Sequence, residues 1–272
     1  MQKEIQWLLK EKYSGKAGKK FNEDVERLKM GEPLDYVIGF TEFLGCIIDL
    51  SKKPLVPRPE TEYWVERAIN ELNNPSSLRS SGQNLRILDI FSGSGCIGIS
   101  IMRHTKNVKI IFAEKDKKFL NQIKINVKLN KKYISNQPSR APVGPARELG
   151  RKIEKNNYKI VQSDVFKNIK GKFDYIFANP PYIPQNRKNK IQKSVLKYEP
   201  HAALFGGKEG LFYVRNFLGE AQNFLNPEGK VYMEFDYIQK REIEKLLKKY
   251  NYKSWKFKKD QYGKWRWVVI CK

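Results

Sequence analysis

The chain alternates between strand-like and helix-like segments from residue 85 to residue 272, and this alternation constrains its fold more than any other feature. Strand-like runs cover 85–91, 108–114, 158–166, 173–181 and 229–235, and apolar residues at helical spacing follow most of them. Parallel strands need a crossover connection, usually a helix. The pattern therefore predicts a doubly wound, mostly parallel sheet with helices on both faces.

Two further strand-like runs, 252–260 and 264–272, close the chain with no helix between them. They are expected to pair as a hairpin and to add an antiparallel edge to the sheet. We therefore predict an α/β fold built on a seven-stranded sheet.

Three regions are expected along the chain. Residues 1–31 form a short N-terminal helical segment, in which Phe21, Val25 and Leu28 stand at helical spacing. Residues 32–53 are interpreted as a β-hairpin linker, and residues 54–272 as the α/β domain. Within that domain, residues 135–157 contain three prolines and few apolar residues, which indicates a flexible insertion.

Charge and composition narrow the class of protein. The net charge is +24 at pH 7, and the lysines are spread along nearly the whole chain. This charge favours non-specific contact with nucleic acid, or it reflects a lysine-rich composition on solvated faces. No apolar run reaches the roughly 18 residues of a membrane helix, and the N-terminus does not resemble a signal peptide. Cys46, Cys96 and Cys271 form no CxxC pair, so we expect a cytoplasmic protein without disulfides or metal.

A glycine-rich turn follows the strand-like run 85–91. In LDIFSGSGCIG, Gly93 and Gly95 stand where a strand turns into a helix, whose free N–H groups can meet a ligand. Glu114 ends the next strand-like run, where a carboxylate can accept hydrogen bonds from ribose hydroxyls. The turn departs from GxGxxG, which disfavours a pyrophosphate ligand. A dinucleotide, S-adenosylmethionine and a purely structural turn all stay open at this point.

A second candidate site is Asn179-Pro180-Pro181-Tyr182, after the strand-like part of 173–181. Ligands of doubly wound sheets bind beyond the carboxyl ends of the strands, so this tetrapeptide is expected beside the glycine-rich turn. The side-chain oxygen of Asn179 and the backbone oxygen of Pro180 can accept both hydrogens of a planar NH2 group, and Tyr182 can stack on it. The prolines stiffen the backbone that presents these oxygens.

Together with other segments, these motifs resemble the protein-(glutamine-N5) methyltransferases, the PrmC/HemK family. The other segments are GEPLDYVIGFTEFLG (31–45), LVPRPETE (55–62), YEPHAALFGGKEGL (198–211) and MEFDYIQ (233–239), the last with Asp236 in place of glycine. The resemblance implies a class I S-adenosylmethionine-dependent methyltransferase with a Rossmann-like fold. Its substrate would be the glutamine in the GGQ motif of peptide-chain release factors.

An adenine-N6 methyltransferase acting on RNA or DNA is the alternative, since such enzymes share the NPPY motif and would suit a basic protein. The PRPETE and GGKEG segments, which nucleic-acid enzymes generally lack, argue against it.

The resemblance also implies roles for individual residues. The residues implied to bind the cofactor are Phe91, Ser92, Gly93, Ser94 and Gly95 at its methionine part, Glu114 at the ribose, Asp164 and Val165 at the adenine, and Asn179. The residues implied to hold the substrate amide and to carry catalysis are Asn179, Pro180, Pro181 and Tyr182, with Arg58 and Glu60 at the mouth of the site.

Some features depart from the family pattern. Phe91 stands where a small residue is more usual, and Val165 where a bulky aromatic is more usual. The N-terminal helical segment is shorter than the family's usual bundle, which implies that docking of the release factor is reduced or shifted. His104 and His201 are not expected to take part in the chemistry.

Overall fold

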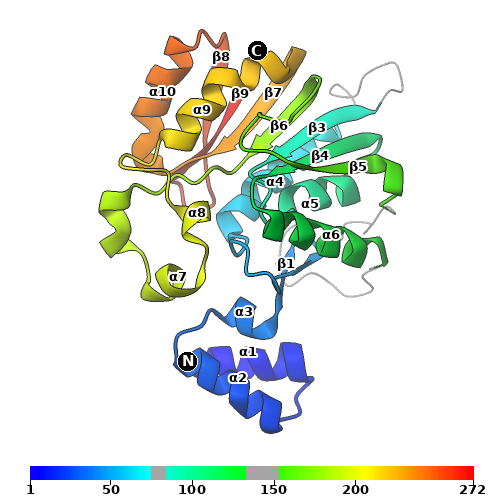
Figure 1. The fold of residues 1–272 in the computed structure, drawn as a ribbon, viewed down its shortest axis with the longest axis vertical. Coiled ribbons are helices and arrows are strands. Elements are labelled where there is room, and N and C mark those ends of the chain that lie inside the picture. The colour runs from blue at the N-terminus through cyan, green and yellow to red at the C-terminus, as the bar shows by residue number, and fades with distance from the viewer. Residues whose placement is uncertain (75–83, 133–152) are drawn as a thin grey trace.

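The computed structural model describes residues 1–74, 84–132 and 153–272. Its centre is a seven-stranded sheet with the strand order β5-β4-β3-β6-β7-β9-β8 (Figure 1). The strands are β3 (Leu85–Ile90), β4 (Val108–Glu114), β5 (Tyr158–Gln162), β6 (Phe173–Ala178), β7 (Leu225–Glu234), β8 (Ser254–Lys259) and β9 (Trp265–Cys271). The first five are parallel, and β9 runs antiparallel to both β7 and β8. The predicted fold class is confirmed.

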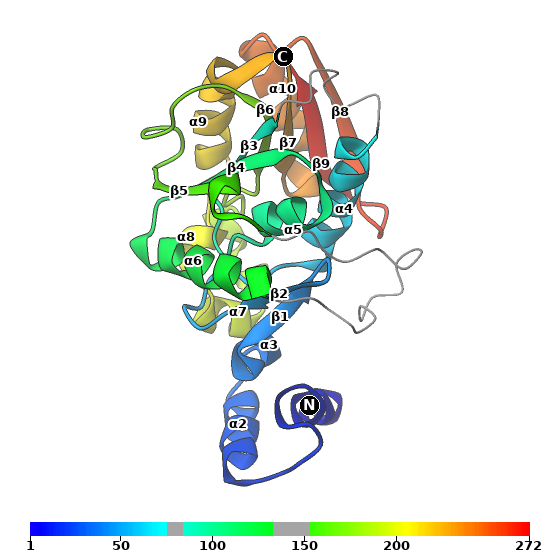
Figure 2. The same ribbon diagram turned by 90° about the vertical axis from the view of Figure 1, so that its right-hand side faces the viewer.

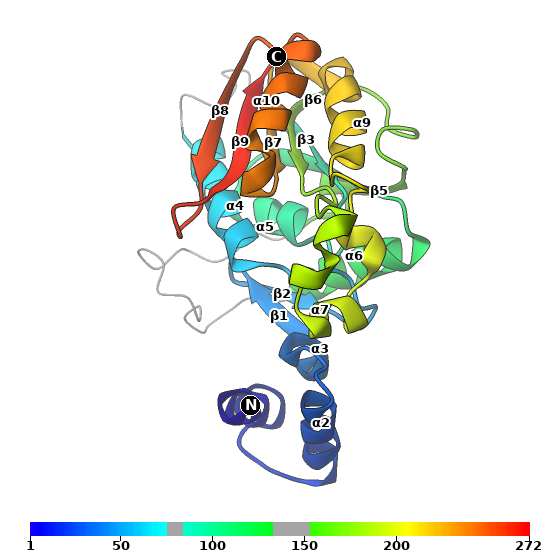
Figure 3. The ribbon, with the colours of Figure 1, turned by 90° about the vertical axis from the view of Figure 1, so that its left-hand side faces the viewer.

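Helices cover both faces of the sheet (Figures 1 and 3). On one face lie α4 (Pro59–Leu72), α5 (Cys96–His104) and α6 (Lys117–Lys132), whose apolar residues join one core cluster with the sheet. On the other face lie α9 (Phe212–Glu220) and α10 (Lys240–Lys249), in a second cluster. Shorter pieces are α7 (Lys193–Tyr198), α8 (His201–Leu204) and the 3₁₀ turns Lys155–Asn157, Gln185–Lys190, Ala221–Phe224 and Tyr237–Gln239.

The order of the strands reverses between β3 and β6, which are hydrogen-bonded neighbours. From β3 the chain builds outward through β4 to β5, and then returns to place β6 on the other side of β3. Such a switch point leaves a crevice beyond the carboxyl ends of the two strands. The glycine-rich turn follows β3 and the NPPY tetrapeptide follows β6, so the topology brings them to one crevice.

The N-terminal helices form a small module with a core of its own. Helices α1 (Gln2–Tyr13), α2 (Lys19–Lys29) and α3 (Leu34–Ile38) lie at the end of the molecule opposite the C-terminus (Figure 2). Their core contains Leu8, Phe21, Leu28, Val37 and Ile38. The β-hairpin predicted over 32–53 begins later than expected, because Tyr36–Ile38, predicted as part of it, form the end of α3, and the chain enters the hairpin only after Gly39.

The hairpin comprises β1 (Phe40–Phe43) and β2 (Cys46–Asp49). Of the insertion expected at 135–157, residues up to 152 lie outside the described part of the chain.

Side-chain amides of α6 tie the hairpin to the domain. Asn126, at 0 % exposure, accepts a hydrogen bond from Asp49 N (2.8 Å), and Asn130 accepts one from Ile47 N (3.1 Å) and donates one to Ile47 O (2.7 Å). The two asparagines are four residues apart, so they lie on one face of the helix. Asn126 also donates to Ser94 O in the glycine-rich turn (2.9 Å). One amide therefore connects the hairpin to the turn that follows β3.

Replacing Asn126 with alanine is expected to lower the free energy of unfolding by about 1–3 kcal/mol, because polar backbone groups would stay buried without partners. Urea denaturation measures this change. The matched control is Asn121→Ala, an exposed asparagine on the same helix. Equal stability of the two variants would show that the Asn126 amide does not hold the hairpin.

Candidate active site

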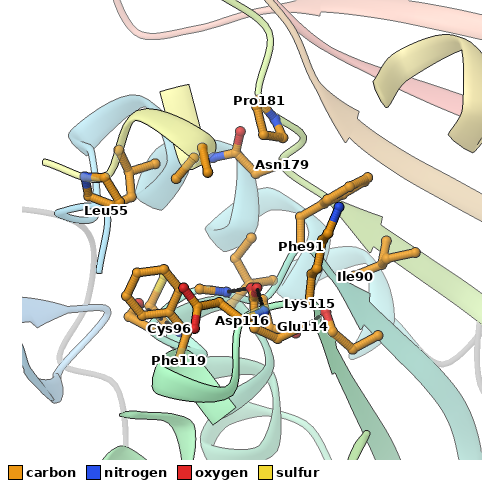
Figure 4. Close-up of a pocket in the computed structure, with 18 of the residues that line it drawn as sticks. Leu55, Ile90, Phe91, Cys96, Glu114, Lys115, Asp116, Phe119, Asn179 and Pro181 are labelled. Carbon is orange, nitrogen blue, oxygen red and sulfur yellow. Dashed lines mark hydrogen bonds between the residues drawn. The ribbon is translucent and has the colours of Figure 1, made fainter. Parts of the chain in front are cut away.

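A cavity of about 420 Å³ opens beyond the carboxyl ends of β3, β4 and β6 (Figure 4). In Figure 4, Asn179 and Pro181 stand on one side of it, and Glu114, Asp116 and Phe119 on the other. Its lining includes the following residues singled out from the sequence: Arg58, Phe91, Ser92, Gly93, Ser94, Glu114, Asp164, Val165, Asn179 and Pro181. Gly95 is not among the lining residues and instead forms the N-cap of α5.

Glu114, at the end of β4, holds the glycine-rich turn in place. Its carboxylate oxygens accept hydrogen bonds from Gly93 N and Asp116 N, each at 2.9 Å. Burial raises the pKa of Glu114, and the backbone donors oppose that shift. Each carboxylate oxygen has a second acceptor site. Glu114 can therefore organise the turn and still accept a hydroxyl of a ligand in the cavity.

Two non-glycine residues of the cavity wall have left-handed backbone conformations. Phe91 has a φ of 60° and Val165 a φ of 49°. This conformation is rare for bulky and β-branched residues and costs about 1–3 kcal/mol, and such strain clusters at functional sites. The Phe91 ring packs against Tyr213 and Phe217 of α9, at centroid distances of 6.0 and 6.2 Å. Phe91 therefore lines the cavity without filling it.

A second cavity of about 310 Å³ adjoins the first. Asn179, Pro180 and Tyr182 line it, together with apolar side chains of the segment that follows, namely Ile183, Ile191, Val195 and Leu204. Residues that line both cavities are Leu55, Arg58, Asn179 and Ala203. The two spaces therefore meet at Asn179. Glu60 lines neither of them.

An ion pair fixes Arg58 at this junction. Its guanidinium donates to Glu199 Oε1 at 2.6 Å, and Glu199 Oε2 accepts from Val56 N at 3.3 Å. Glu199 is buried and Arg58 is half-buried. The pair joins the PRPETE segment to the YEPH segment, which are far apart in the sequence.

The GGKEG segment supports the NPPY backbone from behind. Gly206 N donates to Ile183 O at 3.0 Å, and an isolated parallel bridge joins Ile183 to Phe205. Gln239, from the MEFDYIQ segment, is buried and donates to Tyr182 O (2.8 Å) and Gly210 O (3.1 Å). A Cβ atom at Gly210 would overlap Tyr182 O, so a glycine is required there.

Three residues next to the tetrapeptide were not predicted from the sequence: Thr61 lines the larger cavity, Glu234 lines the smaller one, and Trp64 contacts Glu234. Thr61 and Trp64 come from α4, and Glu234 ends β7, next to β6. A usable signal existed for Glu234, because it ends the parallel strand beside the one that leads into NPPY. For Thr61, which lies in the first turn of α4, the sequence holds no comparable signal.

Neither histidine of the chain lies at the candidate site. His104 and His201 line neither cavity, and each imidazole contacts a backbone oxygen, Leu44 O and Leu196 O respectively, at 2.7 Å.

Within residues 1–74, 84–132 and 153–272, no group of three or more His, Cys, Asp or Glu could hold a metal ion. No helix in the same ranges is long and apolar enough to cross a membrane.

The sequence and the fold of this chain are similar to those of known methyltransferases. The family model described as conserved hypothetical protein 95 matches residues 58–264. The release factor glutamine methyltransferase of Flavobacterium psychrophilum is 36% identical over 245 residues, covering 90% of this chain and 77% of that protein. The enzyme of the same name from Lactococcus lactis is 30% identical over 269 residues, covering 98% and 88%. The solved structure of a methyltransferase from Pyrococcus furiosus aligns with a TM-score of 0.54 at 22% identity, covering 84% of this chain and 88% of that one.

The strand order and this structural likeness show the Rossmann-like fold that class I methyltransferases have. The identities over most of both chains then place it more narrowly. The chain belongs to the release factor glutamine methyltransferase family.

Proposed function

We propose that this chain transfers a methyl group from S-adenosylmethionine to the side-chain amide nitrogen of the glutamine in the GGQ motif of a peptide-chain release factor. The observation that carries the proposal is the meeting of two cavities at Asn179, in a chain whose relatives bear the name of this activity. A translation factor as substrate would place the reaction in the cytoplasm. The net charge of +24 would add non-specific attraction to nucleic acid.

The larger cavity suits S-adenosylmethionine. The ligand needs an acceptor for its ribose hydroxyls and apolar walls for its adenine and methionine parts. The cavity offers Glu114 for the first, and Ile90, Phe91, Phe119 and Val165 for the second. Asp164, on the rim with its ion-pair partner Lys115 at 2.7 Å, is proposed to border the adenine. Ser92, Gly93, Ser94 and Gly95 are proposed to form the turn at the methionine part.

The smaller cavity suits an aliphatic side chain that ends in an amide. Its apolar side chains would contact the methylene groups of glutamine. Asn179 Oδ1 and Pro180 O would accept the two N–H hydrogens, and the Tyr182 ring would lie against the amide plane. Arg58, which lines both cavities, would stand at the junction. We assign Glu60 no contact with either ligand.

The protein would contribute to this reaction mainly by positioning the amide nitrogen against the methyl donor. An amide nitrogen is a poor nucleophile because its lone pair is delocalised into the carbonyl group. When bound, S-adenosylmethionine supplies a methyl group that its sulfonium already activates. Two acceptors at the NH2 group would hold the nitrogen in one orientation, and such positioning is worth about 7–11 kcal/mol in favourable cases. The same oxygens would stabilise the positive charge that develops on nitrogen.

A transfer assay with radiolabelled S-adenosylmethionine tests the proposal. Purified release factor, a release factor with its GGQ glutamine changed to alanine, and RNA and DNA substrates are offered separately. We expect label on the unaltered release factor alone, and mass spectrometry should place one added methyl group on the GGQ glutamine. Label on adenine in nucleic acid, with none on the release factor, would establish the alternative activity instead.

A further inference from the structure

A buried carboxylate, Glu234, lies in the wall of the proposed substrate site. Glu234 is 1% exposed, and its Oε2 accepts hydrogen bonds from Thr61 Oγ1 and from Trp64 Nε1, both at 2.7 Å. Its Oε1 accepts one from the Tyr182 hydroxyl at 3.0 Å. Beyond Thr61, Asn179 Nδ2 lies 3.5 Å from Thr61 Oγ1, a long contact. A chain of polar groups therefore runs from Trp64 through Glu234 and Thr61 to Asn179.

The donor and acceptor roles along this series of polar groups follow from Trp64, its first member. An indole N–H can only donate, so Glu234 Oε2 must act as an acceptor. The Thr61 hydroxyl has a single hydrogen, which it donates to the same oxygen, Glu234 Oε2. Thr61 Oγ1 can then only accept from Asn179, and so it selects the nitrogen end of that amide.

The orientation of the Asn179 amide matters for substrate binding. With Nδ2 toward Thr61, Oδ1 is the amide atom left without this contact, and Asn179 lines both cavities. An oxygen there can accept an N–H of the substrate amide. A flipped Asn179 would set its own NH2 group against the substrate NH2 group, and two donors cannot bond to each other.

We propose that Trp64, Glu234 and Thr61 are positioning residues that fix the Asn179 amide with its oxygen toward the substrate. This inference rests on the proposed function in taking that substrate to be a primary amide. The three residues come from α4 and β7, which are rigid elements, whereas Asn179 stands in the loop after β6. Tyr182 shares the same carboxylate, so Glu234 also links the first and last residues of the tetrapeptide.

The experiment compares Thr61→Val, which removes the hydroxyl, with Thr61→Ser, which keeps it. We expect Thr61→Val to lower kcat about 10- to 100-fold, as for loss of an interaction worth about 1–3 kcal/mol. Thr61→Ser should restore most of this loss. The dissociation constant for S-adenosylmethionine, measured by calorimetry, should change little in either variant. Turnover by Thr61→Val at the level of Thr61→Ser would overturn the proposal.

A matched control separates this effect from the general cost of removing a buried hydroxyl. Thr105 is 2% exposed, and its Oγ1 has no hydrogen-bond partner within the described part of the chain. Thr105→Val should therefore leave kcat unchanged. An equal drop in kcat for the variants at positions 61 and 105 would contradict a specific role for the Thr61 hydroxyl.

A second readout does not depend on turnover. The side-chain NH2 resonances of Asn179, assigned by their loss in Asn179→Ala, report on its hydrogen bond to Thr61. We expect slow hydrogen exchange of this group in the wild type, in Thr61→Ser and in Glu234→Gln, whose amide oxygen must still face the indole. Exchange should be fast in Thr61→Val and in Glu234→Ala.

The two readouts distinguish the failure of this inference from the failure of the proposed function. A wild type that does not methylate release factor would contradict the proposed function, and the Asn179 resonances would still decide the orientation. Identical Asn179 exchange in Thr61→Val and Thr61→Ser would overturn the inference, even if release factor is methylated.

Discussion

Replacing Asn179 with alanine is expected to lower kcat about 10²- to 10³-fold, as does the loss of a single preorganised electrostatic group in other active sites. The affinity for S-adenosylmethionine should fall far less. Asn179 is one of many residues that line the larger cavity, whereas its side-chain oxygen is one of only two acceptors proposed for the substrate amide. Single-turnover kinetics and calorimetry measure the two effects separately.

Asn186→Ala is the control for this variant. Asn186 is exposed and lies in the 3₁₀ turn Gln185–Lys190, a few residues after the tetrapeptide, so it tests whether any asparagine change in this segment matters. We expect wild-type kcat for Asn186→Ala. If Asn179→Ala weakened cofactor binding as much as turnover, Asn179 would be a cofactor contact and not the holder of the substrate amide.

Replacing Gly210 with alanine is expected to damage both stability and turnover. The residue has a φ of 71°, and an added Cβ would overlap Tyr182 O and stand 2.7 Å from Gln239 Nε2. Left-handed backbone costs about 1–2 kcal/mol for alanine, and overpacking adds about 1–3 kcal/mol. Because the overlap is with the backbone of Tyr182, the tetrapeptide must move. The free energy of unfolding, measured with denaturant, and kcat should therefore both fall.

Gly263→Ala is the control that separates the cost of the steric overlap at position 210 from the cost of a left-handed backbone. Gly263 has a similar φ of 76°, lies in the β8–β9 hairpin, and has nothing within 4 Å of its added Cβ. That variant should lose only the backbone cost of about 1–2 kcal/mol and keep its turnover. Equal stability of the two variants, with full activity at position 210, would show that the GGKEG segment does not support the site.

The sheet and the neighbouring positions of the two motifs could be predicted from sequence for a simple reason. Strand and helix periodicities are local, and parallel topology then forces the ends of β3 and β6 to one edge. Gly93 and Asn179 were accordingly expected side by side, and both line the larger cavity. The error at Tyr36–Ile38 came from a short apolar run that is equally compatible with a strand and with one helical turn.

The supporting contacts could not be predicted in the same way. The bond between Thr61 and Glu234 joins residues 173 positions apart, and no local pattern specifies which buried carboxylate meets which helix. In the PRPETE segment, the sequence predicts the charged Glu60 at the mouth of the site, whereas its neighbour Thr61 is the buried residue. Adjacent residues of a helix point in different directions, so the charged residue of such a pair need not be the one that supports the site.

A structure with S-adenosylhomocysteine and a glutamine-containing release factor peptide tests the central claim most directly. We expect the glutamine side chain in the smaller cavity, with its nitrogen at the junction and its two hydrogens on Asn179 Oδ1 and Pro180 O. A glutamine amide bound by other groups, with Asn179 turned away from it, would contradict the proposed role of the tetrapeptide.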